Sequence, residues 1–197
     1  MASVTFLPTQ ALLHAALLII AISFLIASPP AATAARGAAK PPRPPATTLQ
    51  FYMHDRPGDT AVRVAPATPL NFSGDPSGGV AAMFGSVYVM DNPLTAAPGA
   101  NSTLLGRAQG IYAMASREDE FGLLMVLTYS FVRGPFNGSS FSVVGRNPIQ
   151  QPVREMPIVG GTGAFRLARG YCMARTQAAD GMDAVVAYNA TIFHLHH

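Results

Sequence analysis

Three ionisable side chains lie in or next to apolar stretches of this sequence and could do chemistry: Asp55, Tyr112 and Arg154. A carboxyl group in apolar surroundings has a raised pKa and can deliver a proton. A guanidinium group can hold such a carboxyl ionised, or it can bind an oxyanion. The same groups could equally form a structural ion pair. The residue pattern alone therefore leaves an acid site and a structural pair open.

Other motifs with catalytic meaning are missing from the sequence. The glycine-rich segment 160–163 lacks the Lys-Ser/Thr pair of a phosphate-binding loop. No serine nucleophile elbow, zinc-protease motif or cysteine pair occurs, and Cys172 is the single cysteine. His194, His196 and His197 could bind a transition metal loosely, but no further ligands complete a closed site. We therefore predict no metal, no cofactor and no intrachain disulfide.

Eight segments rich in aromatic and β-branched residues predict strands, because Gly, Pro, Asn and Asp separate them. The segments span residues 48–54, 84–90, 107–115, 122–132, 139–146, 154–159, 165–176 and 184–194. Turn residues separate them at 91–93, 134–135, 137–138, 160–163 and 180–181. No stretch after the N-terminal region keeps a long 3.6-residue apolar period, so we expect helices to be short or absent.

Short connections, and a domain without lysine to protect sheet edges, predict an all-β fold. We expect an eight-stranded antiparallel closed barrel, since closure removes edges altogether, with a two-sheet sandwich as the alternative. The interior of such a barrel is either packed solid or holds one small ligand. Which of these applies depends on the side chains that face inward.

Strand alternation indicates which side chains share a face. Phe51 and Asp55 lie on one face of the first segment, and Gly110, Tyr112 and Met114 lie on one face of the third. The small residue beside Tyr112 would leave room for a central pocket. The alternative is that Gly110 marks a bulge and Tyr112 simply packs in the core.

The N-terminal region has the features of an export signal. Residues 11–27 are almost wholly apolar, two prolines follow, and residues 32–34 offer a small-x-small cleavage pattern. We predict a signal peptide over residues 1–34, a Pro/Ala-rich linker over 35–48 and a barrel domain over 49–197. An uncleaved membrane anchor is the alternative; after cleavage no membrane contact is expected. The nine methionines are scattered, so most are expected to fill the core.

The distribution of charge and the glycosylation sequons indicate what the protein does not bind and where it is located. Arg36, Lys40 and Arg43 supply the whole net charge of +3, since ten arginines balance ten acidic residues from position 49 onward. A nucleic-acid-binding face needs clustered cations, so that function is excluded. N-glycosylation sequons occur at Asn71, Asn101, Asn137 and Asn189. They predict a secreted eukaryotic glycoprotein, with Asn189 the least suitable because it falls in a predicted strand.

Several segments, in order and at family spacing from about residue 49 to 194, resemble plant dirigent proteins. They are FYMHD at 51–55, FGSVYVMDNPLT at 84–95, GRAQGIY at 106–112, FNGSSFSVVGRNPI at 136–149, REMPIVGGTG at 154–163, RGY at 169–171 and YNATIF at 188–193. The resemblance implies an eight-stranded barrel, usually a homotrimer, secreted to the plant cell wall. It also implies a protein without its own oxidative centre, in which an extracellular laccase or peroxidase makes the phenoxy radicals that the barrel orients.

The resemblance assigns roles to individual residues. Asp55 matches a proposed acid, Tyr112 a pocket residue, and Arg154 a pocket residue thought to assist proton transfer. Phe51, on the face of Asp55, is expected to contact the substrate too. Two positions depart from the pinoresinol-forming members, which have Asp where this chain has Asn147 and an aromatic residue where it has Met114. Both are expected to contact the substrate, but an amide cannot donate a proton as an acid does.

The expected function is stereochemical guidance of phenoxy-radical coupling, from monolignol-type phenols to lignans or related products. The Gly-Arg-Asn-Pro form at 145–148 looks like the other large dirigent branch. Some of its members close a single quinone methide, as in pterocarpan formation, and that is the alternative. Two further alternatives are a lipocalin-like module that binds phenolics and a cell-wall protein that organises lignin.

Overall fold

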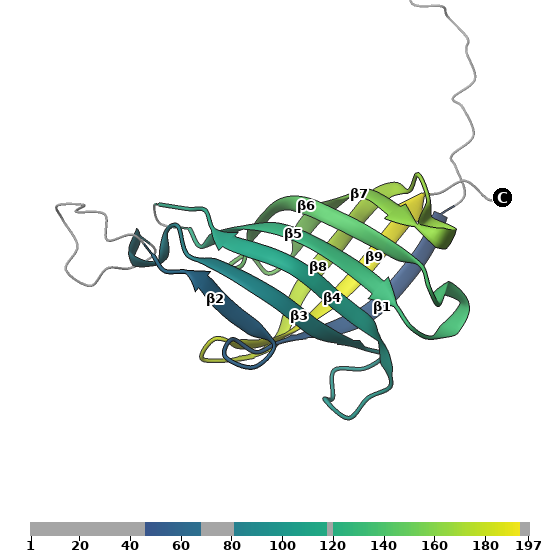
Figure 1. Ribbon diagram of the computed structural model, residues 1–197, viewed down its shortest axis with the longest axis horizontal. Helices are drawn as coiled ribbons and strands as arrows, with labels where there is room; N and C mark the ends of the chain where they lie inside the picture. Colours follow the sequence, from purple (N-terminus) through teal and green to yellow (C-terminus); the bar gives the residue numbers. More distant parts are fainter. Residues whose placement is uncertain (1–45, 68–80, 118–119, 194–197) are drawn as a thin grey trace, which may run out of the picture. The chain divides into compact units, whose positions relative to one another are not determined.

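The structure is a computed structural model that describes residues 46–67, 81–117 and 120–193. Within these residues nine strands form one antiparallel sheet, and three short 3-10 helices lie between them (Figure 1). The strands are β1 (Ala46–Asp55), β2 (Ala61–Ala65), β3 (Val87–Thr95), β4 (Leu104–Met114), β5 (Gly122–Phe131), β6 (Ser140–Pro148), β7 (Arg154–Thr162), β8 (Arg169–Asp180) and β9 (Asp183–Phe193). The helices are η1 (Ala81–Met83), η2 (Gly134–Phe136) and η3 (Gly163–Phe165).

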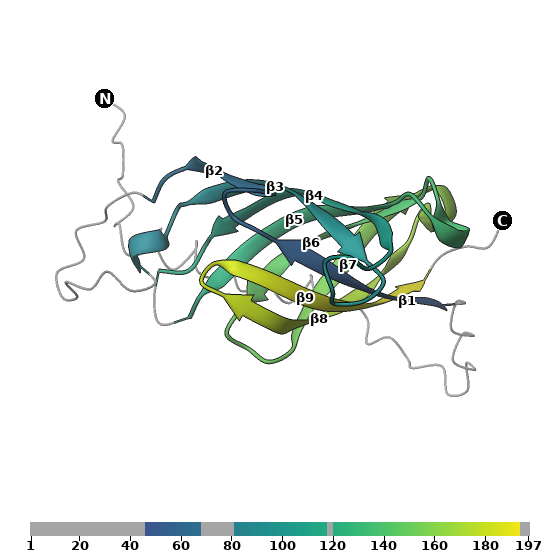
Figure 2. The same ribbon diagram turned by 90° about the horizontal axis from the view of Figure 1, so that it is seen from below.

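Eight of the strands close into a barrel. β1 pairs with β9 along its whole length, and Figure 2 shows these two strands side by side. β1 also pairs with β3, where Tyr52 lies opposite Thr95 and Met53 opposite Leu94, and this contact closes the ring. The predicted eight-stranded antiparallel barrel is confirmed, and the expectation of few helices holds for the described residues.

β2 is the strand that the sequence did not indicate. It pairs with β3 alone and extends that strand outside the ring. Only Ala61 of its five residues is buried, so it lacks the alternation of large inward side chains that marks the other strands. Its short length and exposed Val62 and Val64 gave no strand signal.

The predicted turn at residues 91–93 is wrong, because β3 runs through it to Thr95. The amide of Asp91 donates to the Thr60 carbonyl oxygen at 2.9 Å, on the side of β3 that faces β2. Pro93 lies two residues further along β3, so its nitrogen faces the same edge of the strand as the Asp91 amide. At that edge Pro93 falls in the gap between the part of β3 that pairs with β2 and the part that pairs with β1. A proline is tolerated there because no ladder hydrogen bond is lost.

Other boundaries shift by a few residues. Residues 160–162 belong to β7 rather than to a turn, and the chain reverses at η3. Phe165, predicted to begin a strand, lies in η3 and packs its buried ring against Phe131 and Phe136. β1 begins at Ala46, three residues before the predicted start of the domain.

One half of the barrel interior is packed solid and the other is hollow. Six aromatic rings fill the solid half, with centroid separations of 5.1–6.3 Å among neighbours. They are Phe51, Tyr129, Phe131, Phe141, Phe165 and Tyr188. Burial of large aromatic side chains supplies much of a small domain's stabilisation, so this cluster is the core that supports the hollow half.

The predicted signal peptide and most of the linker lie outside the described residues, as do Asn71, His194, His196 and His197. In the part of the chain that is described, no helix has the length and apolar character needed to cross a membrane.

Candidate functional site

The hollow half of the barrel holds a pocket of about 350 Å³. Five predicted site residues line it: Asp55, Tyr112, Met114, Asn147 and Arg154. They come from β1, β4, β6 and β7, so a closed barrel is required to bring them together. The volume is near the lower end of the ~300–1,000 Å³ typical of small-molecule pockets, which suits one small aromatic ligand.

Tyr112 reaches the pocket because β4 alternates as the sequence predicted. Its ring is stacked on that of Tyr88 from β3, with centroids 4.8 Å apart and planes at 11°. Gly110 does not mark a bulge, since it pairs in register with Met90 and Leu127. Burial raises the pKa of the Tyr112 phenol far above its usual value, so this hydroxyl is neutral and can act as a hydrogen-bond donor.

Asp55 is the last residue of β1 and faces the pocket beside Tyr112. Burial raises the pKa of its carboxyl group above the usual value. The Asn92 side chain opposes this by donating a hydrogen bond from Nδ2 to Asp55 Oδ1 at 3.0 Å, and the nearby charge of Asp183 raises the pKa further. The environment therefore favours the protonated form that a proton donor needs.

Arg154 begins β7 and is buried, with a relative exposure of 3% for the residue. Its Nε donates to Asn147 Oδ1 at 3.1 Å and its Nη1 to Thr176 Oγ1 at 2.9 Å. Burial lowers the pKa of this guanidinium from its usual very high value, but arginine stays charged in proteins. Because these side-chain partners are neutral, the positive charge is left for a pocket ligand to balance.

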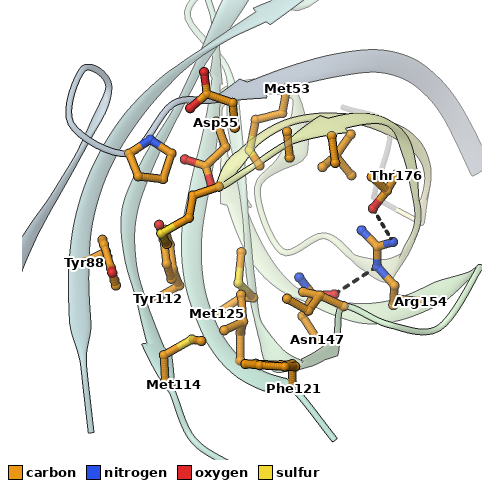
Figure 3. Close-up of a pocket in the computed structure, with 18 of the residues that line it drawn as sticks. Met53, Asp55, Tyr88, Tyr112, Met114, Phe121, Met125, Asn147, Arg154 and Thr176 are labelled. Atoms are coloured by element: carbon orange, nitrogen blue, oxygen red, sulfur yellow. Dashed lines mark hydrogen bonds between the residues drawn. The ribbon is translucent and has the colours of Figure 1, made fainter. Parts of the chain in front are cut away.

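The acid and the cation lie on opposite sides of the pocket (Figure 3). Asp55 and Tyr112 stand on one side, and Arg154 with its hydrogen-bond partners stands on the other. Among the described residues no ion pair joins Asp55 to Arg154. The structural pair that the sequence left open does not form, and a ligand between the two walls meets a carboxyl group with a raised pKa at one end and a cation at the other.

Methionine side chains make up much of the remaining wall. Five of the nine methionines line the pocket: Met53, Met83, Met114, Met125 and Met182. Most methionines were expected to fill the core, and Met53, Met114 and Met125 are buried core residues that also line the pocket, whereas Met182 is exposed. Methionine is flexible and its polarizable sulfur makes favourable contacts with aromatic rings, so this wall is suited to an aromatic ligand.

Phe51 lies away from the pocket lining. It shares the inward face of β1 with Asp55, but four residues earlier, and is buried in the aromatic cluster. Its ring stacks on Tyr188, with centroids 5.3 Å apart and planes at 9°. Tyr188 itself lines the pocket, so Phe51 packs behind the pocket lining.

Several residues of the site escaped the sequence analysis: Asp183 and Thr176, which line the pocket, and Asn92, which donates a hydrogen bond to Asp55 from behind the lining. Asn92 sits in an Asp-Asn-Pro segment that has the composition of a turn. Asp183 and Thr176 flank the β8–β9 hairpin, which a bulge between Thr176 and Ala178 bends. Tyr88 did carry a usable signal, since it is an aromatic residue on the inward face of a predicted strand.

The protein is a closed β-barrel of the class that binds a small ligand inside, in an apolar pocket with an acid on one wall and a guanidinium group on the other. Comparison with known proteins identifies the family. A family model described as Dirigent-like protein matches residues 46–193. Dirigent protein 23 of Arabidopsis thaliana is 45% identical over 153 residues, covering 75% of this chain and 78% of that protein. Pterocarpan synthase 1 of Glycine max is 48% identical over 153 residues with the same coverage.

Solved structures agree with the sequence comparison. The structure of a pterocarpan synthase dirigent protein superposes with a TM-score of 0.67 at 45% identity, covering 78% of this chain and 97% of that one. The chain belongs to the dirigent protein family. The resemblance found in the sequence is thereby confirmed.

Proposed function

We propose that this protein binds reactive phenolic intermediates, phenoxy radicals or quinone methides, and orients them so that the bond they form gives one stereoisomer. The protein itself does not oxidise the phenol; an extracellular laccase or peroxidase is the radical source. The observation that supports this most directly is the placement of Asp55 and Arg154 on opposite sides of an apolar pocket without an ion pair between them. Such a pocket can orient a molecule that has a basic oxygen at one end and a developing negative charge at the other.

In radical coupling, two phenoxy radicals form a carbon–carbon bond and yield a bis-quinone methide, and the oxidase is the oxidant. The rings then close as internal hydroxyl oxygens add to the benzylic carbons. Each addition moves an electron pair to a ring oxygen, which gains a proton while the hydroxyl loses one. The pocket would exclude the wrong face of approach, and Asp55 would serve as the proton donor.

The pairing of Arg154 with neutral Asn147 favours a second candidate, in which one quinone methide forms and closes. Protonated Asp55 gives its proton to a benzylic hydroxyl that leaves as water, and the ring phenol releases its proton to solvent. An internal hydroxyl oxygen then adds to the benzylic carbon and returns a proton to the Asp55 carboxylate. The electron pair moves to the ring oxygen, where Arg154 would stabilise the negative charge until solvent protonates it.

The similarity to pterocarpan synthases supports this second candidate, as does a pocket sized for one small ligand. No oxidant is needed for the ring closure itself.

We further propose that the protein is secreted to the plant cell wall, glycosylated and trimeric. Asn101 and Asn137 lie in exposed turns, where glycans are sterically tolerated, whereas Asn189 lies within β9. Enzymatic deglycosylation of the plant-expressed protein should reduce its mass, and Asn101→Gln with Asn137→Gln should remove most of that change. An unchanged mass would argue against passage through a glycosylating pathway.

The oligomer is supported by a row of apolar side chains on the outer wall. Val62, Val89, Ile111, Val126 and Val144 lie directly opposite one another across five adjacent strands, and each is at least 38% exposed. Exposed apolar patches of this kind mark interaction surfaces, and we propose that a second copy of the chain covers it. Val126→Glu should dissociate the oligomer in sedimentation; an unchanged mass would place the interface elsewhere.

The decisive experiment oxidises coniferyl alcohol with laccase, with and without the purified protein, and resolves the products by chiral chromatography. A second arm supplies an isoflavanol without oxidant and follows ring closure. One enriched enantiomer in the first arm supports radical guidance, and stereoselective closure in the second supports quinone-methide chemistry. Tight phenol binding with no stereochemical effect in either arm would instead favour a simple binding module. Altered wall lignin on knockout with unchanged soluble lignans would favour a lignin-organising protein.

A further inference from the structure

Asn92 is a buried polar residue that the chemistry described above does not use. It lies on the inward face of β3 and is 0% exposed. Its Nδ2 donates to Asp55 Oδ1 at 3.0 Å. Its own Oδ1 is buried and accepts no hydrogen bond from any described residue. A buried acceptor without a partner is destabilising, so folding stability does not explain why an amide occupies this position.

We propose that Asn92 is a positioning residue that holds the Asp55 carboxyl with Oδ1 turned into the barrel wall and Oδ2 toward the pocket. This inference rests on the proposed role of Asp55 as proton donor. Among the described residues Asn92 Nδ2 is the one side-chain donor to Asp55, and Asp55 Oδ2 has no such partner. The amide therefore selects which oxygen meets a ligand.

The same hydrogen bond counterbalances the other groups around Asp55. Burial and the charge of Asp183 on β9 raise the pKa of the carboxyl, whereas donation from Asn92 lowers it. Tyr112 on β4 and Tyr188 on β9 face Asp55 as neutral phenols, since burial raises both of their pKa values. His54, the preceding residue, interacts instead with Thr95 Oγ1 at 2.8 Å. Because its hydrogen bond offsets part of the rise in the pKa of Asp55, Asn92 allows this carboxyl group to release a proton as well as to hold one.

The test replaces Asn92 and follows Asp55 directly. In protein labelled with carbon-13 at aspartate side chains, the Asp55 carboxyl signal is assigned as the one that Asp55→Asn removes, and its titration is recorded. Asn92→Leu keeps the branched skeleton of four side-chain heavy atoms and removes the donor, so the midpoint should rise by about one pH unit, the shift expected for loss of one hydrogen bond to a charged group. Asn92→Asp is nearly isosteric and should also raise it, since two carboxyl groups then share the site.

A matched control is Asn101→Leu, which changes an exposed asparagine in a turn and should leave the titration unchanged. Folded Asn92→Leu or Asn92→Asp protein with an unshifted Asp55 midpoint would overturn the proposal. The titration needs no substrate, so it stays informative even if the protein has no stereochemical effect. If the proposed function holds as well, the pH profile of stereoselectivity should move by the same amount and in the same direction as the titration.

Discussion

Arg154 Nε donates to Asn147 Oδ1 at 3.1 Å, so a buried cation facing the pocket is held by a neutral amide. A carboxylate at position 147 would form a charge-assisted pair with the same nitrogen. The guanidinium would then be neutralised before any ligand arrives. The choice of Asn over Asp therefore sets the charge that a ligand meets.

Asn147→Asp should weaken the binding of anionic phenols. We expect the affinity for 4-nitrophenolate under mildly alkaline conditions to fall about tenfold, equivalent to about 1.4 kcal/mol. The affinity for the neutral ether 4-nitroanisole should change little, because that ligand does not need the cation. Calorimetric titration measures both. Equal losses for the two ligands would indicate a steric effect and contradict the charge argument.

Asp55→Asn should abolish stereochemical guidance and stabilise the fold near neutral pH. The folded-state pKa of Asp55 is raised above its ordinary value of 3.8 by burial of the carboxyl group. Between that value and the raised one, the folded protein binds more protons than the unfolded chain, so stability falls as pH rises. The amide that replaces the carboxyl group does not ionise, so the variant does not lose this stability as the pH rises. Thermal unfolding across the pH range should show the variant gaining stability relative to the wild type above pH 3.8, and a constant difference would show that Asp55 does not titrate abnormally.

Gly110→Ala should disrupt the wall that carries Tyr112. Gly110 has φ of +149°, and an added Cβ would lie 2.1 Å from the Val126 carbonyl oxygen. We expect a loss of about 3 kcal/mol or more in the free energy of unfolding, from backbone strain and overpacking together. Gly99→Ala is the control, since nothing lies within 4 Å of its added Cβ. Urea unfolding that finds the two variants equally stable would contradict this packing.

Met114→Phe should narrow the range of ligands. The flexible methionine lines the pocket, and a rigid ring there would reduce its volume. Isoflavanol-sized ligands should lose about tenfold in affinity, while smaller monolignols should retain theirs. Met173→Phe is the control, because Met173 lies in an outer hollow of the barrel. Unchanged isoflavanol affinity in Met114→Phe would mean that ligands do not approach this side chain.

The sequence was sufficient to predict the barrel and five pocket residues, because alternation identifies inward side chains and the family motifs mark Asp55, Tyr112 and Arg154. Alternation does not report depth along the barrel axis, which depends on strand stagger. For this reason Phe51 and Asp55 share a face, yet one lies in the aromatic core and the other in the pocket. Asn92 was missed because an Asp-Asn-Pro segment has turn composition, and only tertiary pairing makes it a strand.

The central claim is that the protein directs stereochemistry without consuming oxidant. The most direct measurement is the enantiomeric excess of the product at increasing protein concentration, with laccase activity and phenol supply held fixed. We predict that the enantiomeric excess rises to a plateau with whichever of the two substrates, coniferyl alcohol or the isoflavanol, the protein prefers. The rate at which laccase consumes coniferyl alcohol should stay constant. With Asp55→Asn the product should be racemic. Racemic product at every protein concentration, with monolignol and isoflavanol alike, would contradict it.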